Sequence, residues 1–561
     1  MKQQKKIAIY QVFPRLFGNR KSTNTPNGTI EENGVGKLSA FTSKALNTIQ
    51  KIGITHIWYT GIIEHASKTD YTQYGIPCDH PGVVKGNAGS PYAIRDYYDV
   101  DPDLADVVPN RMKEFDALIE RTHKAGLKAI IDFVPNHVAR QYHSDAKPKG
   151  IKDLGEEDDM RTTFSANNNF YYIPGQSLEL QFNAEEYEEN PAKVTGNDCF
   201  SASPSVNDWY ETVKLNYGVD YMNGRMIFFD PVPDTWHKML DILLFWAGKK
   251  VDAFRCDMAE MVPVEFWAWA IPQVKAKYTE IIFIAEVYNP AEYRNYIFNG
   301  KFDYLYDKVG LYDTLRAITC GEQTTKAITG CWQALEGIQT NMLNFLENHD
   351  EQRIASSFFA QDPFKAIPAM IVAATMNVNP VMIYFGQELG EKGMDSEGFS
   401  GKDGRTTIFD YWGIKSIQAW QNDGKYTLSL LSEEQKRLRL FYTTLLRLCQ
   451  KEQAIYQGIF YDLMYVNYDN PHFNPDKQYA YIRQSGKELI LVVVNFDATD
   501  TKLKVNIPQH AFEYMDIDPK KYISGIDLLS EKKVRTTLCL ESPVEVEVKA
   551  YSGVCIKFCR T

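Results

Sequence analysis

The chain has 561 residues, of which 44% are hydrophobic and 13% aromatic. That length exceeds what one hydrophobic core usually serves, so we expect a globular protein of two or three domains, one of them large. The formal net charge is −11, with dispersed acids, which excludes nucleic acid and membrane surfaces as partners and favours a neutral or cationic ligand.

Near the N-terminus, Ile7–Phe13 is an apolar run of only seven residues that ends at Pro14-Arg15. It is typical of a buried strand rather than of the apolar segment of a signal peptide. The nine cysteines are odd in number and form no CxxC pair, which favours reduced thiols. We therefore expect a cytoplasmic protein, although removal of a signal peptide would leave the same pattern.

Eight short apolar runs recur through the first 400 residues, with helical segments between them. Continuous apolar strands separated by helices imply parallel pairing, and eight of them predict an α/β fold, a closed (β/α)8 TIM barrel. The runs are Ile7–Phe13, Ile54–Tyr59, Leu127–Phe133, Val251–Phe254, Ile281–Ala285, Phe302–Tyr306, Met342–Leu346 and Val381–Phe385.

Two parts of the chain depart from this alternation. Residues 138–216 are rich in Asn, Asp, Gly and Tyr, which predicts an inserted domain after the third strand. Beyond Tyr456 the runs become β-like and are separated by turns such as Ser485-Gly486, which predicts a C-terminal antiparallel β-sandwich at 456–561. Residues 1–137 and 217–455 then form the barrel, whose last helix follows Ser432.

Four segments carry the residues suited to chemistry. In a parallel barrel, residues at the carboxyl ends of the strands face the active site, so their acids are expected to meet at one mouth. The segments are Asp132-Phe-Val-Pro-Asn-His137, Phe254-Arg-Cys-Asp257, Ile284-Ala-Glu286 and Asn348-His-Asp350.

Paired acids at one mouth are what cleavage of an acetal requires: one acid protonates the leaving oxygen and one carboxylate traps the oxocarbenium-like centre. Arg255 shares a strand face with Asp257, and we expect it to keep Asp257 ionised. Glu286 has a more apolar sequence context and is expected to retain its proton. Each acid alone is about as often a helix cap or ion-pair partner, so the prediction depends on the ordered set.

The four segments, in this order and spacing, resemble the signature regions of glycoside hydrolase family 13, the α-amylase family, and the resemblance covers essentially the whole chain. It implies that Asp257 is the nucleophile, Glu286 the acid/base and Asp350 the transition-state stabiliser. It also implies that Arg255 orients Asp257 and is braced by Asp132.

The resemblance extends to residues that contact the sugar. It implies that His137 and His349 hydrogen-bond hydroxyls of the sugar being cleaved. Upstream, Ser90-Pro-Tyr92-Ala-Ile-Arg-Asp96-Tyr97 resembles the family loop whose tyrosine stacks on that sugar, which makes Tyr92 the stacking residue. Asp96, in the same motif, is predicted to bind substrate.

Departures from the family pattern concern the leaving-group side and calcium. Glu260 and Met261 occupy positions where many members carry a Lys-His pair. Val213-Lys-Leu-Asn216 replaces the common Pro-Asp-Leu-Asn, whose Asp binds a structural calcium together with the residue matching Asn136. A cation at Lys214 repels calcium, and its ammonium is expected to take the calcium's place. No metal ligand and no organic cofactor are predicted.

The predicted activity is hydrolysis of α-1,4-glucans or maltooligosaccharides with retention, by double displacement. One alternative is transglycosylation, since the nucleophile and the acid are the same in both reactions. Another is a catalytically silent relative that binds glucans, against which stand the three acids Asp257, Glu286 and Asp350.

Overall fold

The computed structural model describes residues 5–182, 185–518, 524–540 and 542–559. Eight parallel strands form one sheet in the order β15-β14-β13-β12-β5-β2-β1-β16, and a parallel bridge between Asn344 and Val381 joins its two edges. The predicted (β/α)8 barrel and its eight strands are confirmed. The strands are β1 (Ala8–Val12), β2 (His56–Tyr59), β5 (Lys128–Phe133), β12 (Ala253–Cys256), β13 (Ile282–Ala285), β14 (Tyr304–Tyr306), β15 (Met342–Leu343) and β16 (Val381–Tyr384).

Both faces of the barrel strands are buried, which explains their continuous apolar sequences. Because side chains alternate along a strand, one set of residues packs together inside the barrel and the other packs against the surrounding helices. The interior set takes one or more residues from each strand and includes Ile9, Trp58, Ile130, Ala253, Ile284, Tyr306, Leu343 and Met382.

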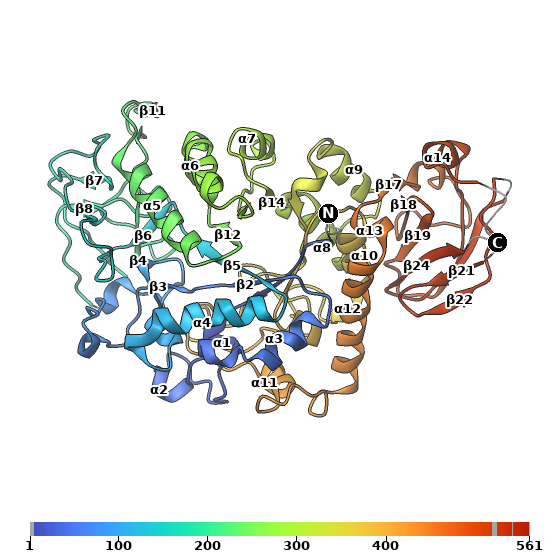
Figure 1. The fold of residues 1–561 in the computed structure, drawn as a ribbon, viewed down its shortest axis with the longest axis horizontal. Coiled ribbons are helices and arrows are strands. Elements are labelled where there is room, and N and C mark those ends of the chain that lie inside the picture. The colour runs from blue at the N-terminus through green and yellow to red at the C-terminus, as the bar shows by residue number, and fades with distance from the viewer. Residues whose placement is uncertain (1–4, 183–184, 519–523, 541, 560–561) are drawn as a thin grey trace.

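Helices surround the barrel (Figure 1). In the last long helix, Leu438, Leu445 and Leu448 are buried and Phe441 is half-buried, so these residues form the inner face of the helix. Within the described ranges, no helix has the length and apolar character needed to cross a bilayer. The helices of this part of the chain are α1 (Pro14–Phe17), α2 (Ile30–Asn33), α3 (Ser43–Gln50), α4 (Arg111–Lys124), α5 (Asp234–Gly248), α6 (Val264–Lys277), α7 (Tyr293–Phe298), α8 (Asp313–Cys320), α9 (Ala327–Ala334), α10 (Ile367–Thr375), α11 (Lys415–Gln421), α12 (Glu433–Lys451) and α13 (Gln453–Tyr456).

Short antiparallel strand pairs cover one end of the molecule (Figure 1). In the sequence they lie between β5 and α5 and directly after β2. The pairing of β6 with β9 sets His137 opposite Lys214, and the pairing of β3 with β4 carries the segment that follows Tyr92. These strands are β3 (Ile63–His65), β4 (Ile94–Val100), β6 (His137–Ala139), β7 (Tyr172–Ile173), β8 (Ala192–Lys193), β9 (Thr212–Lys214), β10 (Val219–Asp220) and β11 (Met226–Ile227).

The C-terminal region forms an antiparallel sheet in the order β17-β18-β19-β24-β21-β22, together with the pair β20-β23. It lies at the opposite end of the barrel from β7 and β8 (Figure 1). The predicted C-terminal antiparallel β fold is confirmed, and this region also contains a helix that the sequence did not predict, α14. The elements are β17 (Ile459–Asp462), β18 (Gln478–Ser485), β19 (Glu488–Asn495), β20 (Thr501–Val505), α14 (Gln509–Tyr514), β21 (Ser524–Asp527), β22 (Lys532–Val534), β23 (Val544–Val548) and β24 (Ser552–Cys559).

Candidate active site

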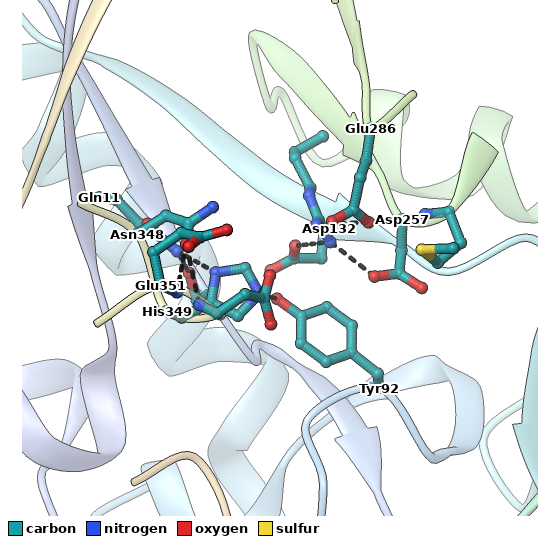
Figure 2. A network of polar contacts seen from close by, with 12 residues as sticks. Gln11, Tyr92, Asp132, Asp257, Glu286, Asn348, His349 and Glu351 are labelled. Atoms are coloured by element: carbon teal, nitrogen blue, oxygen red, sulfur yellow. Dashed lines mark hydrogen bonds and ion pairs between the residues drawn. The ribbon is translucent and has the colours of Figure 1, made fainter. Parts of the chain in front are cut away.

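Three adjacent barrel strands bring the acidic residues of the first three segments together. Asp132 lies in β5 opposite Arg255 of β12, Asp257 directly follows β12, and Glu286 directly follows β13. Asp350 comes from the loop after β15. The side chains of Asp132, Asp257 and Glu286 point toward one another (Figure 2).

The carboxyl ends of these strands open into a cavity of about 370 Å³. This volume is near the lower end of the range of about 300–1,000 Å³ that is usual for ligand pockets. The cavity is lined by Lys85, Ser90, Tyr92, His137, Trp209, Glu211, Thr212, Asp257, Met258, Glu286, Tyr288, Asp350, Ile408 and Phe409.

Arg255 lies buried at the centre of the acidic cluster. Its Nη1 is 2.7 Å from Asp257 Oδ1 and 3.5 Å from Asp132 Oδ1, and its Nη2 is 2.7 Å from Glu286 Oε2. Its Nε donates to the Tyr306 hydroxyl at 3.2 Å. One guanidinium therefore holds both Asp257 and Glu286, whereas the sequence led us to expect contacts with Asp257 and Asp132 but not with Glu286.

Asp257 has one carboxylate oxygen bound to Arg255 and one that is buried and, within the described part of the chain, unpaired. Arg255 binds Oδ1, whereas Oδ2 has no hydrogen-bond partner among the described residues. Burial and the charge of Glu286 raise the pKa of Asp257 well above its usual range, against the opposing effect of Arg255. Arg255 opposes this rise through its charge and its hydrogen bond, as the sequence led us to expect, but in the site without ligand it does not cancel the loss of hydration.

Glu286 is fixed through both of its carboxylate oxygens. The backbone N–H of Met258 donates to Oε2 at 2.9 Å and the Tyr288 hydroxyl donates to Oε1 at 2.7 Å. Behind this pair, the backbone N–H of Asn289 donates to Glu260 Oε2 at 3.0 Å. Glu260 therefore holds the segment that carries Tyr288.

Asp350 is coupled to His349 and Tyr92. His349 Nε2 lies 3.0 Å from Asp350 Oδ2 and 2.5 Å from the Tyr92 hydroxyl. The rings of Tyr92 and His349 stack with centroids 5.2 Å apart. Burial lowers the pKa of His349 well below its usual range, so the ring is neutral. Burial and the charge of Glu286 raise the pKa of Asp350 to about 7.

The remaining predicted residues divide between the cavity and the region behind it. His137 lines the cavity, and burial lowers its pKa to about 3. Asp96 is not among the described residues that line the cavity. Its carboxylate instead accepts hydrogen bonds from the Ser144 hydroxyl and from the backbone N–H groups of Tyr98 and Ala146, so Asp96 fastens a loop of the inserted segment.

The position predicted to disfavour calcium is occupied by an ammonium group. Lys214 Nζ donates to Asn136 Oδ1 at 2.8 Å and lies 2.5 Å from Asp198 Oδ1. Within the described ranges, no group of three or more His, Cys, Asp and Glu side chains is arranged to hold a metal ion. These oxygens are already bound to a cation, so the residues present do not fit a calcium ion.

Several residues that build the site were missed in the sequence. Gln11 contacts His349 Nδ1 at 2.8 Å, and Trp58 donates to Asp132 Oδ2 at 3.1 Å. Gln11 and Tyr306 lie near the carboxyl ends of β1 and β14, so the rule that selected Asp257 could have found them. The pair Lys85 and Glu211 carried no such signal.

The barrel, with paired carboxylates at the ends of its strands, defines a glycosidase fold and site. A family model described as the alpha amylase catalytic domain matches residues 11–425. The chain belongs to the α-amylase family, glycoside hydrolase family 13, and is a glycosidase.

Individual relatives are distant. Alpha-amylase 2 of Dictyoglomus thermophilum is 22% identical over 504 residues, covering 89% of this chain and 70% of that protein. A cyclomaltodextrinase of a Bacillus species is 22% identical over 525 residues, covering 90% and 75%. The crystal structure of a maltogenic α-amylase from Thermotoga neapolitana superposes with a TM-score of 0.64 at 19% identity, covering 99% of both chains.

Proposed function

We propose that this protein hydrolyses α-1,4-glucans or maltooligosaccharides with retention of configuration, through a covalent glycosyl ester on Asp257. Relatives named as amylase, cyclomaltodextrinase and maltogenic amylase support the substrate class. The observation that carries the chemistry is the buried Asp257 Oδ2, unpaired among the described residues, beside a cavity that Asp257 and Glu286 both line.

The placement of the two carboxylates supports retention. In retaining glycosidases the paired carboxyl groups are about 5–5.5 Å apart, against about 6.5–9.5 Å in inverting enzymes, which need room for a water molecule. Asp257 Oδ1 and Glu286 Oε2 are each 2.7 Å from neighbouring nitrogens of one guanidinium. That arrangement favours direct attack by Asp257 on the anomeric carbon.

In the first step, Asp257 Oδ2 attacks the anomeric carbon while Glu286 donates a proton to the leaving oxygen. In the second step, Glu286 takes a proton from water, and the resulting attack on the ester restores both carboxyl groups. Asp350 stabilises the positive charge that develops on the sugar in each transition state.

Variants at the two acids test this proposal. Asp257→Asn and Glu286→Gln are expected to lower kcat on maltoheptaose by about 10⁴-fold or more. Glu351→Gln, beside Asp350 but bound to the Tyr312 hydroxyl, should retain activity. NMR of the first products should show the α-anomer. Unchanged turnover by Asp257→Asn would support the catalytically silent relative instead.

Transglycosylation remains the second candidate because it uses the same two acids. On the side that we assign to the leaving group, the Tyr288 hydroxyl donates to Glu286 and the Asn289 backbone N–H donates to Glu260. A time course with maltotriose separates the two reactions: hydrolysis yields only shorter sugars, whereas transfer yields oligomers longer than the substrate.

A further inference from the structure

One wall of the cavity contains an ion pair that the proposed chemistry does not use. Lys85 Nζ lies 2.9 Å from Glu211 Oε2, and the two side chains are 10% and 6% exposed. Both residues line the same cavity as the catalytic acids. Lys85 Nζ also lies 3.4 Å from the Asp208 carbonyl oxygen and 5.2 Å from the centre of the Tyr210 ring.

The pair joins two segments that are far apart in the sequence. Lys85 follows the short helix at Pro81–Val83, and Glu211 immediately precedes β9. Separating the partners of a buried ion pair leaves uncompensated buried charges, which costs more than separating an exposed pair. On this side, the inserted segment and the loop at Lys85 therefore form one continuous surface.

The loop that carries Lys85 is also held to a third segment of the chain by hydrogen bonds. The backbone N–H of Ala88 donates to the Phe409 carbonyl at 3.0 Å. Buried Arg15 donates from Nη1 to the carbonyls of Gly89 and Ile408, both at 3.1 Å. The loop at 85–89 is thus fastened to the segment at 408–409, whose two side chains also line the cavity.

These contacts make a wall that runs from residues 208–211 through 85–89 to 408–409. The leaving group must lie near Glu286, which protonates its oxygen and which Met258 and Tyr288 hold. The wall is built from other segments, and we assign it to the opposite, glycone side. A glucan chain extending past the glycone sugar would have to break the Lys85–Glu211 pair or the hydrogen bonds that hold the loop at 85–89 to residues 408–409.

We propose that this wall closes the glycone side of the site, so that the enzyme removes short units from the non-reducing ends of α-glucans and does not cleave within a chain. The inference rests on the proposed function and specifies its substrate. Lys85 and Glu211 are then specificity-determining residues: they exclude chains without a free non-reducing end. The small cavity volume agrees with a short glycone site.

Two forms of maltoheptaose, labelled at the reducing end, test the proposal with the wild-type protein. One has a free non-reducing end and the other carries a 4,6-ethylidene block there. We expect the free form to be shortened about 100-fold faster or more, the discrimination that a pocket of fixed shape can achieve. We also expect β-cyclodextrin, which has no chain end, to resist cleavage.

Equal rates on the free and blocked forms, or rapid opening of β-cyclodextrin, would overturn the proposal while leaving the proposed hydrolysis intact. Failure to cleave either heptaose would instead refute the proposed function, and with it this inference.

Variants at Lys85 and Glu211 test whether their ion pair causes the difference in cleavage rate between free and blocked maltoheptaose. Lys85→Ala combined with Glu211→Ala removes both charges together, which avoids leaving one buried charge unpaired. The double variant should lower the ratio of the cleavage rates of the free and blocked forms by about tenfold, which is equivalent to about 1.36 kcal/mol. Asp116→Ala combined with Lys249→Ala removes an ion pair on the outer helices and should leave the difference unchanged. If the folded Lys85/Glu211 variant keeps the wild-type ratio of rates, the ion pair does not determine this specificity.

Discussion

Arg255 Nη2 lies 2.7 Å from Glu286 Oε2, while Nη1 of the same guanidinium lies 2.7 Å from Asp257 Oδ1. The predicted nucleophile and the predicted acid are thus held by one cation. Asp132 Oδ1 lies 3.5 Å from the same guanidinium, and Asp350 lines the same cavity as the two acids. Like charges this close cannot all ionise, so the cluster retains protons that a general acid requires.

Replacing Arg255 by Lys tests whether this geometry matters beyond the charge. A single ammonium cannot reproduce the planar fork that reaches both carboxylates. We expect Arg255→Lys to lower kcat by about 100-fold or more, the usual loss when a preorganised electrostatic contact is removed. Steady-state kinetics on maltoheptaose, with circular dichroism to confirm folding, provide the measurement. Activity within threefold of wild type would show that charge alone suffices (about 0.7 kcal/mol in barrier height).

The hydrogen bond from the Tyr288 hydroxyl to Glu286 Oε1, 2.7 Å long, predicts a positioning role. Tyr288→Phe keeps the ring and removes only the donor. Hydrogen bonds to charged groups contribute about 1.5–3 kcal/mol, so kcat should fall about 10- to 100-fold with little change in KM. Tyr304→Phe, on β14, is the matched control. A rise in KM at constant kcat would contradict the positioning role.

The contacts of Lys214 predict independence from calcium. Its ammonium binds Asn136 and Asp198, so EDTA should change neither kcat nor the melting temperature. Lys214→Ala should lower stability by about 1–3 kcal/mol, because Asn136 is left buried with an unsatisfied acceptor. Chemical denaturation with and without EDTA provides both values. Reversible loss of activity in EDTA would show that calcium binds despite Lys214.

Glu397 predicts a specific dependence of stability on pH. Burial raises its pKa to about 9, and Oε2 has no hydrogen-bond partner in the described part of the chain. A raised pKa in the folded state adds stability that is complete below the unfolded value of about 4.3 and is lost as pH rises toward 9. Stability of wild type should therefore fall over this interval.

Glu397→Gln removes that titration. The variant should match wild type near pH 4 and exceed it at pH 8 by about 5 kcal/mol, according to the free energy per pKa unit. Urea unfolding at the two pH values measures the difference. The same difference at both pH values would mean that packing of the amide, and not ionisation, is responsible.

Much of the barrel could be read from the sequence because its physical signal is local. A strand such as Ile282–Ala285 or Val381–Tyr384 is a short run with both faces buried, which leaves an uninterrupted apolar sequence. Strand ends of a parallel barrel converge, so the order of the four segments also predicted which acids would meet. The C-terminal edge strand β22 is only three residues long and has exposed residues. Such a strand shows little of the alternating apolar pattern by which a strand is predicted.

The sequence alone therefore determined the barrel and the family, and it predicted the acids Asp257, Glu286 and Asp350, because these depend on residue type and position along strands. Only the tertiary structure decided that Arg255 contacts Glu286 as well as Asp257. It also decided that Asp96 fastens a loop and that Lys85 pairs with Glu211, 126 positions away in the sequence. Such contacts depend on how distant loops pack, and a side chain's burial and partners, which set its charge state, exist only after that packing.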